Sequence, residues 1–313
     1  MLDFFRRDEV RAAIRRRLVL LSVLAALPTY LALGARSWWF LELATHFRVH
    51  YLLGLCPAVI AAWYWRRPIL LAWVGVAVVI NLWLVVPLYF GPHVTGAKPT
   101  LRLMVANVLT QNQQYDRLLN LIDAENPDVV VLLEVNLAWR QGLQALGSEF
   151  PHKIFETRED NFGICLLSKI PADRLEVTEI GTSGVPSIEA TFQHQGQTLQ
   201  LIATHTLPPG SRANASERNA HLQAAAEKLA QLPSPKLFVG DLNITPWSPY
   251  FDDLLEVGQL ENSQRGFGVQ GTWFSQLPID HVLHSNDVLV VDRRVGARFG
   301  SDHRPLIVDL EIK

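Results

Sequence analysis

Three long runs without charged residues occupy the first third of the chain and limit what it can fold into. No Asp, Glu, Lys or Arg occurs from Leu18 to Ala35, from Val49 to Trp65 or from Pro68 to Phe90. A helix needs about 20 apolar residues to cross the hydrocarbon core of a bilayer. Buried core helices, or a cleaved signal peptide for the first run, explain less of the pattern. We therefore predict three transmembrane helices, at about 18–35, 48–65 and 68–90.

The arginines around these runs predict their orientation. Six arginines precede the first run, and Arg66 and Arg67 separate the second from the third. Only Arg36 and Arg48 lie between the first two runs. Short cytoplasmic loops retain positive charge, so we expect a cytoplasmic N-terminus in the inner (plasma) membrane. Three crossings would place everything after Phe90 on the opposite side, which is periplasmic or extracellular.

The rest of the chain has the composition of a soluble domain. Turn-forming residues fill positions 91–99, which we predict to be a linker between a membrane anchor (1–90) and one domain (100–313). The first 97 residues hold ten of the 28 basic residues but four of the 30 acidic ones, so the remainder carries a net charge of −8. A surface that binds duplex DNA is usually basic. The charge therefore weakens the case for a simple DNA-binding module.

Cysteine usage adds little. Cys56 lies in a predicted membrane span and Cys165 in a soluble apolar run, so we expect no disulfide between them. There is no Cys-x-x-Cys motif for a metal or for redox chemistry.

Short apolar runs recur through the soluble part and predict buried strands. They lie at 101–106, 129–133, 163–167, 188–192, 199–203, 236–239, 281–283, 288–291 and 306–310. Helical spacing of apolar residues occurs at 115–125 and 217–232, and two prolines follow the second of these segments. Helices thus interleave with many strands, which indicates an α/β sandwich.

Polar residues stand at the ends of several of these predicted strands or within a few residues of their starts. They are Asn107, Glu134, His205, the Gly240-Asp241-Leu242-Asn243 segment, Asp280-His281 and Ser301-Asp302-His303. Each alone is explained by a cap, a solvated charge or a core histidine. Together they combine hard carboxylate oxygens for a cation such as Mg²⁺ with amide and imidazole donors for phosphoryl oxygens. Asp241 and Asn243 should share one side of a strand end, because alternate residues of a strand face the same way.

In their order and spacing these motifs resemble the exonuclease, endonuclease and phosphatase superfamily, which includes deoxyribonucleases, sphingomyelinases and inositol-polyphosphate phosphatases. The resemblance covers about residues 101–310. It implies a four-layered α/β sandwich of two mixed β-sheets flanked by helices. It also implies a metal-dependent phosphoric ester hydrolase.

The resemblance implies a role for each matched residue. Glu134 would bind the divalent cation, Mg²⁺ with Mn²⁺ or Ca²⁺ as alternatives, with Asn107 beside it and Asp302 joining the metal region. His205 and Asn243 would donate to phosphoryl oxygens.

For proton transfer the same resemblance leaves two candidates. Asp241 would orient or deprotonate the attacking water, and Asp280 would hold His303. Whether Asp241 or His303 is the general base stays open at this stage. We expect in-line attack by water without a covalent intermediate.

One departure bears on the substrate. Abasic-site endonucleases have a tyrosine where this chain has Thr204-His205, which disfavours abasic-site repair. We predict a membrane-anchored phosphodiesterase acting on a membrane-proximal phosphodiester or lipid headgroup. Nuclease activity on DNA or RNA, and a catalytically silent tethered module, are the alternatives. The predicted partners are the lipid bilayer and the phosphoester substrate, and no protein partner is expected.

Overall fold

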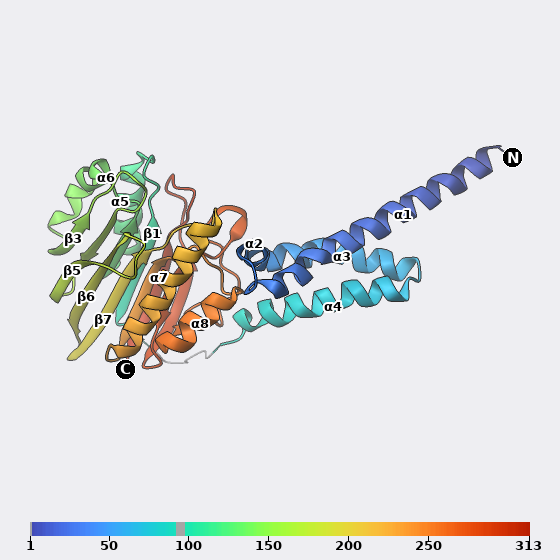
Figure 1. Cartoon of the computed structure of the whole chain (residues 1–313). Helices are drawn as coiled ribbons and strands as arrows, with labels where there is room; N and C mark the ends of the chain where they lie inside the picture. Colours follow the sequence, from blue (N-terminus) through green and yellow to red (C-terminus); the bar gives the residue numbers. More distant parts are fainter. Residues whose placement is uncertain (1, 92–97) are drawn as a thin grey trace. The chain divides into compact units, whose positions relative to one another are not determined.

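The computed structural model describes residues 2–91 and 98–313, without the side chains of residues up to 8 and of Ser275. Residues 92–97 of the predicted linker lie outside the described residues. The chain divides into two compact units (Figure 1). The first, called here the helical unit, comprises residues 1–87 with 247–249, and the second, the sheet unit, comprises 88–246 with 250–313.

The helical unit consists of helices that pack through small and branched apolar side chains. Its elements are α1 (Leu2–Leu31), η1 (Ala32–Gly34), α2 (Trp39–Leu43), η2 (Ala44–Phe47), α3 (Arg48–Tyr64), α4 (Pro68–Val85) and η3 (Val86–Tyr89). Ala26 of α1, Leu55 and Ala58 of α3, and Val74 and Ala77 of α4 form a common core. Three helical segments, Glu9–Gly34, Trp39–Tyr64 and Pro68–Tyr89, are long and apolar enough to cross a membrane. They cover the three runs identified in the sequence except for the last residue of each.

The first sheet of the sheet unit has six strands in the order β11-β12-β1-β2-β4-β3. Their bounds are β1 (Leu101–Asn107), β2 (Val129–Leu133), β3 (His152–Glu156), β4 (Ile164–Ser168), β11 (Val288–Val295) and β12 (Leu306–Ile312). β1 and β2 are parallel and the other neighbours are antiparallel, so the sheet is mixed. Helices α5 (Tyr115–Glu125) and α6 (Leu137–Gly142), with η4 (Leu143–Gly147), connect its strands.

The second sheet has six strands in the order β5-β6-β7-β8-β10-β9. Their bounds are β5 (Ala172–Glu179), β6 (Pro186–His194), β7 (Gln197–His205), β8 (Lys236–Asp241), β9 (Glu261–Asn262) and β10 (Asp280–His284). β7 and β8 are parallel, joined by helix α7 (Arg212–Gln231), and the other pairs are antiparallel. Helix α8 (Pro249–Gly258) precedes β9, and η5 (Phe274–Gln276) precedes β10.

Three apolar cores stack these elements into four layers (Figure 1). The middle core lies between the sheets and includes Leu103, Val131, Leu201 and Val239. A second core packs α5 and α6 on the first sheet, and a third packs α7 and α8 on the second. Side chains alternate between the two faces of a strand. The predicted four-layered α/β sandwich of two mixed sheets, preceded by three apolar helices, is therefore confirmed.

The predicted buried strands correspond to observed ones, whereas β3, β5 and β9 were missed. All three are edge strands. β5 alternates between exposed and partly covered residues and β9 has two residues, so neither carries a continuous apolar run. α6 and α8 were also missed. Six residues give α6 too few turns for a clear periodicity, whereas the apolar spacing of α8 is comparable to that of α5 and was overlooked.

Candidate active site

Strand alternation directs the predicted site residues toward one place between the sheets. On β1, Leu103 and Val105 face the middle core, so Asn107 continues on that face. On β8, Leu237 and Val239 do the same, so Asp241 follows them. His205 at the end of β7 and Asp280 at the start of β10 also face this way. The residues two positions from them, Ala203 and Val282, lie in the middle core. The sheets thus bring polar side chains from four strands together.

The Asp241 carboxylate is the hub of this cluster and is 1% exposed. Its Oδ2 lies 3.2 Å from Asn107 Nδ2, 3.6 Å from His205 Nε2 and 3.6 Å from His303 Nε2. Three nitrogen groups therefore converge on one oxygen. Burial, reinforced by repulsion from the Asp280 carboxylate, raises the pKa of Asp241.

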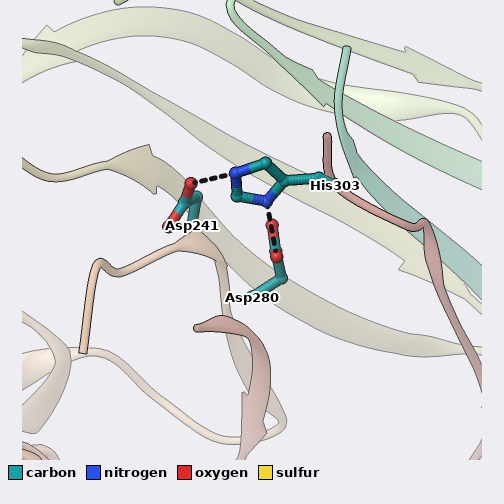
Figure 2. A group of neighbouring side chains, drawn as sticks. All are labelled: Asp241, Asp280 and His303. Carbon is teal, nitrogen blue, oxygen red and sulfur yellow. Dashed lines mark hydrogen bonds and ion pairs between the residues drawn. The ribbon is translucent and has the colours of Figure 1, made fainter. Parts of the chain in front are cut away.

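His303 is held between two carboxylates, as Figure 2 shows. Its Nδ1 lies 2.9 Å from Asp280 Oδ2, and its Nε2 faces Asp241. Burial alone lowers the pKa of the imidazole, but the charges of Asp280 and Asp241 outweigh it and raise the pKa to about 10. Burial likewise works to raise the pKa of Asp280, but the charge and hydrogen bond of His303 hold it below its usual value. His303 and Asp280 therefore form a buried ion pair at neutral pH.

Glu134 forms a second, more accessible part of the site. It follows β2 with a positive φ of 66°, a conformation that turns the chain sharply at the strand end. Asn107 Nδ2 donates to Glu134 Oε1 at 2.9 Å, and the backbone N–H of Thr110 donates to Oε2 at 3.1 Å. The Asn107 amide thus contacts both Glu134 and Asp241. One side chain joins the first-sheet carboxylate to the second-sheet cluster.

Asp302 and Asn243 lie at the edge of this arrangement. Asp302 is exposed, and its Oδ2 accepts a 2.9 Å hydrogen bond from Trp273 Nε1. Asn243 does not continue the strand, because β8 ends at Asp241 and Asn243 has a φ of 48°. Its backbone N–H donates to Asp241 Oδ1 at 3.0 Å, while its Nδ2 donates to Thr206 O at 2.8 Å. The expectation that Asp241 and Asn243 share a strand face is wrong, since a turn rather than strand alternation joins them.

Backbone proximity also shapes the site. Gly240 has a φ of 143°, and a Cβ placed there would meet the carbonyl oxygen of Thr204 at 1.8 Å. Glycine therefore lets the ends of β7 and β8 approach closely, next to His205 and Asp241. Ser301 fixes the facing loop by donating to Asn107 O at 2.8 Å and accepting from the His303 N–H at 3.0 Å.

The segment before β10 supplies contacts to the site that sequence reasoning left as ordinary loop structure. Thr272 Oγ1 accepts the N–H of Asp280 at 3.2 Å, and Trp273 binds Asp302 and lies 6.1 Å, ring to ring, from His303. A tryptophan N–H that donates to a carboxylate 29 residues away leaves no local sequence pattern and is visible only in three dimensions.

Arg293 of β11 ties this segment in place from the opposite sheet. It is 1% exposed, its Nε donates to Ser263 Oγ at 3.2 Å, and its Nη1 donates to Gln270 Oε1. Gln270 Nε2 in turn donates to Arg293 O at 2.8 Å. The fold thus buries an arginine and joins it to Gln270, which stands two residues before Thr272 in the chain.

The donor set fits a divalent cation. Glu134 has oxygens that accept only neutral donors among the described residues, and Asp280 Oδ1 is buried without a hydrogen-bond partner. Ligand atoms of Asp241, Asp280 and His303 also lie within 4.8 Å of one another. However, a histidine must be neutral to bind a metal, and a cationic His303 opposes a second positive charge in that trio. We therefore favour the Glu134 side of the site for a hydrated hard cation, which keeps several waters.

Comparison with known proteins agrees with this fold and shows the family of the chain. The model of the endonuclease/exonuclease/phosphatase family matches residues 104–303. The chain belongs to this family, whose members are metal-dependent phosphoester hydrolases. The predicted enzyme class is therefore confirmed, and the match spans every predicted site residue. No curated protein of similar sequence is found.

Solved structures share the fold at low sequence identity. Zebrafish (D. rerio) TDP2 complexed with a single-strand DNA product is 17% identical, with a TM-score of 0.58, over 67% of this chain and 98% of that one. The human Nocturnin catalytic domain with bound sulfate is 17% identical, with a TM-score of 0.58, over 69% and 94%. A Staphylococcus aureus beta toxin mutant with bound magnesium ions is 18% identical, with a TM-score of 0.53, over 67% and 99%.

Proposed function

We propose that the chain is a membrane-anchored phosphodiesterase that cleaves a phosphodiester by in-line attack of water. The observation that carries the proposal is the convergence of Asn107, His205 and His303 on the buried Asp241 carboxylate. A tetrahedral phosphoryl group needs several nitrogen donors around its oxygens and one base beside the attacking water. This cluster supplies the nitrogen donors and the base from neighbouring buried side chains.

In this proposal Asp241 is the general base. His303 has its Nδ1 engaged by Asp280 and is positively charged, so it acts as a donor to a phosphoryl oxygen through Nε2. Asp241 has a raised pKa and carries the lone pairs that face these donors, so it accepts the proton of the attacking water. The water oxygen bonds to phosphorus as the bond to the leaving oxygen breaks on the opposite side.

His205 keeps the donor role expected from the sequence, and Asp280 fixes the ring of His303. The second donor in this proposal is Asn107 instead of Asn243, because the Asn243 amide donates to Thr206 O at 2.8 Å whereas the Asn107 amide lies beside Asp241.

Glu134 would hold the divalent cation, Mg²⁺ in this proposal, with Asn107 beside it. Such a cation, when bound, withdraws charge from the phosphoryl group. Asp302 is held by Trp273 at the rim, and we assign it the orientation of the cation's hydration shell.

The proposed substrate is a membrane-proximal phosphodiester such as a lipid headgroup ester. The residues after position 97 carry a net charge of −8, which disfavours strong binding to a nucleic-acid backbone. Three helices able to cross a membrane precede the sheet unit, and a tether raises the effective concentration of any substrate in the same bilayer. The negative charge thus disfavours a polyanionic nucleic acid, and the shared location favours a lipid-borne ester.

Turnover measurements on the full chain in detergent with Mg²⁺ test this function. We expect hydrolysis of glycerophosphodiester or phospholipid headgroup esters, lost in Asp241→Asn. Hydrolysis of DNA or RNA at least about a hundredfold faster than any lipid ester would reverse the substrate assignment. No Mg²⁺-dependent hydrolysis of any phosphoester would reject catalysis and support the silent tethered module.

A nuclease is the second candidate function. The fold is shared with TDP2, which has been solved with a single-strand DNA product. In this chain the ring of Phe162 lies 5.0 Å from the ring of His205, at the edge of the cluster. An aromatic ring next to a phosphoryl site can stack on a base. Phe162→Ala should lower turnover of a dinucleotide more than that of a glycerophosphodiester if this candidate is correct.

A further inference from the structure

A groove in the helical unit is lined by three arginines at one end and by apolar side chains over most of its length. Its volume is about 790 Å³. The residues that line it are Arg15, Arg16, Val19 and Val23 of α1 with Arg67, Pro68, Ile69, Leu70 and Trp73 at the start of α4. None of them belongs to the site described above.

Helical spacing explains why charge and apolar surface follow one another along the groove. Arg15, Val19 and Val23 recur every four residues and therefore share one side of α1. Eight residues of helix span about 12 Å. On α4 the same gradient runs from Arg67 to Trp73. The groove thus changes from cationic to apolar over the distance between a lipid phosphate and the upper acyl chain.

The arginine end of the groove has uncompensated charge. Arg15, Arg16 and Arg67 are exposed. Glu42 is an acidic residue of the helical unit, but its carboxylate lies 3.4 Å from His46 and not beside these arginines. Within the side chains that the structure describes, no acidic group pairs with the three arginines. An anion from outside the chain would therefore find three guanidinium groups available.

The apolar wall of the groove is held in shape by direct contacts between α1 and α4. Trp73 Nε1 donates to Val23 O at 3.4 Å, and the ring of Trp73 stacks on Tyr30 at 4.0 Å. Tyr30 Oη donates to Trp73 O at 2.5 Å. These contacts join the two helices at the apolar end of the groove. A preformed slot of this kind binds a ligand without first having to open.

We propose that this groove binds one anionic diacyl phospholipid, with its phosphate among Arg15, Arg16 and Arg67 and an acyl chain along Val23 and Trp73. Guanidinium groups bind phosphate through paired hydrogen bonds, and basic pockets between membrane helices suit anionic headgroups. The inference rests on the proposed membrane location. We do not assign this lipid as the substrate, because none of the groove residues belongs to the site of Asp241 and His303.

Lipid retention by the purified full chain, measured by native mass spectrometry, tests the proposal. The probes are dioleoyl phosphatidylglycerol and, as the zwitterionic reference, dioleoyl phosphatidylcholine. The variant Arg15→Gln with Arg16→Gln should lose about 30-fold in preference for phosphatidylglycerol, from about 1 kcal/mol for each arginine near a membrane surface. Arg67→Gln should lose about fivefold on the same basis.

Arg11→Gln with Arg17→Gln is the matched control. It removes the same two charges from the same helix, at exposed positions outside the groove. We expect its lipid preference to stay within about twofold of the parent chain, because neither arginine lines the groove and charges exposed to solvent away from a bound phosphate are screened. An equal loss in this control would overturn the proposal, because the effect would then be general surface charge.

A groove-filling variant tests the apolar part independently of charge. Val23→Trp keeps all three arginines and should displace the acyl chain, so the bound phosphatidylglycerol should fall severalfold. Unchanged retention in Val23→Trp would remove the groove as the binding place. Hydrolysis of a soluble phosphodiester by these variants should equal that of the parent chain. Loss of lipid binding and loss of catalysis are therefore separate results, and failure of one hypothesis is distinguishable from failure of the other.

Discussion

The first sheet presents Glu134 at a half-buried position, whereas the second sheet presents Asp241 and Asp280 almost wholly removed from solvent. Glu134 accepts hydrogen bonds from an amide and a backbone N–H. Asp241 and Asp280 instead face the imidazole of His303 and change its pKa and their own. A partly hydrated carboxylate suits a cation that keeps its water. Buried carboxylates next to an imidazolium suit proton transfer, so the sheets contribute different chemistry to one site.

The largest effect is expected from the first-sheet half. Removing divalent cations with a chelator should abolish turnover, and Mg²⁺ should restore it. Glu134→Gln removes the negative oxygen but keeps the amide shape, so activity should stay lost at ordinary Mg²⁺ concentrations. Turnover and Mg²⁺ titration by calorimetry measure both effects. Wild-type metal affinity in Glu134→Gln would move the cation to the second-sheet trio.

Next in size are the reacting groups of the second sheet. Asp241→Asn and His303→Ala should each lower kcat by about 10² to 10⁴, the range that a general base or acid commonly contributes. Far-UV circular dichroism checks that both variants fold. If Asp241→Asn kept more than a tenth of the activity while His303→Ala lost it, His303 would be the base and our assignment would be reversed.

A smaller loss is expected for Asp280→Asn, because Asp280 orients His303 without touching the substrate. The pKa of His303, about 10 in the parent chain, should fall in this variant. A raised folded-state pKa contributes stability that is present below the unfolded value of about 6.5 and is lost as the pH rises through about 10. Nuclear magnetic resonance titration of the ring measures the pKa. A loss of activity larger than in Asp241→Asn would show that Asp280 reacts directly.

For Trp273→Phe we expect activity below saturating Mg²⁺ to fall by about tenfold or less. This variant keeps the ring but removes the N–H that donates to Asp302 Oδ2. Removing one hydrogen bond to a charged group costs about 1.5–3 kcal/mol when buried, and Asp302 is exposed, so the effect should be smaller. The Mg²⁺ concentration for half-maximal activity should rise while kcat at saturating Mg²⁺ stays close to the parent value. A change in kcat with no change in the Mg²⁺ requirement would show that Trp273 does not act through the cation.

The smallest effect is expected from removing the helical unit. A fragment of residues 91–313 should hydrolyse a soluble phosphodiester with a kcat within about twofold of the full chain, because the sheet unit has its own cores. Hydrolysis of a lipid ester in vesicles should fall much further, as the tether is lost. An inactive, folded fragment would contradict the division of labour between the two units.

Much of the fold could be predicted from the sequence, because buried strands and helices have recognisable patterns of apolar residues. β2 and α5 were predicted with their observed bounds, since a strand buried on both faces is continuously apolar and an amphipathic helix repeats every 3.6 residues. The edge strand β5 was missed, because it has no continuous apolar run and becomes a strand through its pairing with β6. The three apolar helices were likewise recognisable from composition alone.

The sequence by itself determined which residue types stand at the strand ends: Asn107, Glu134, His205 and Asp241 all follow from counting along the chain. Only the tertiary structure decided which of them meet. The Asn107 amide bridges Glu134 and Asp241, although 134 positions separate Asn107 from Asp241. Arg293 is buried behind the loop that holds Thr272, because two different sheets enclose it. Distances of a few ångströms between residues far apart in sequence set the pKa of His303, and sequence spacing carries no record of them.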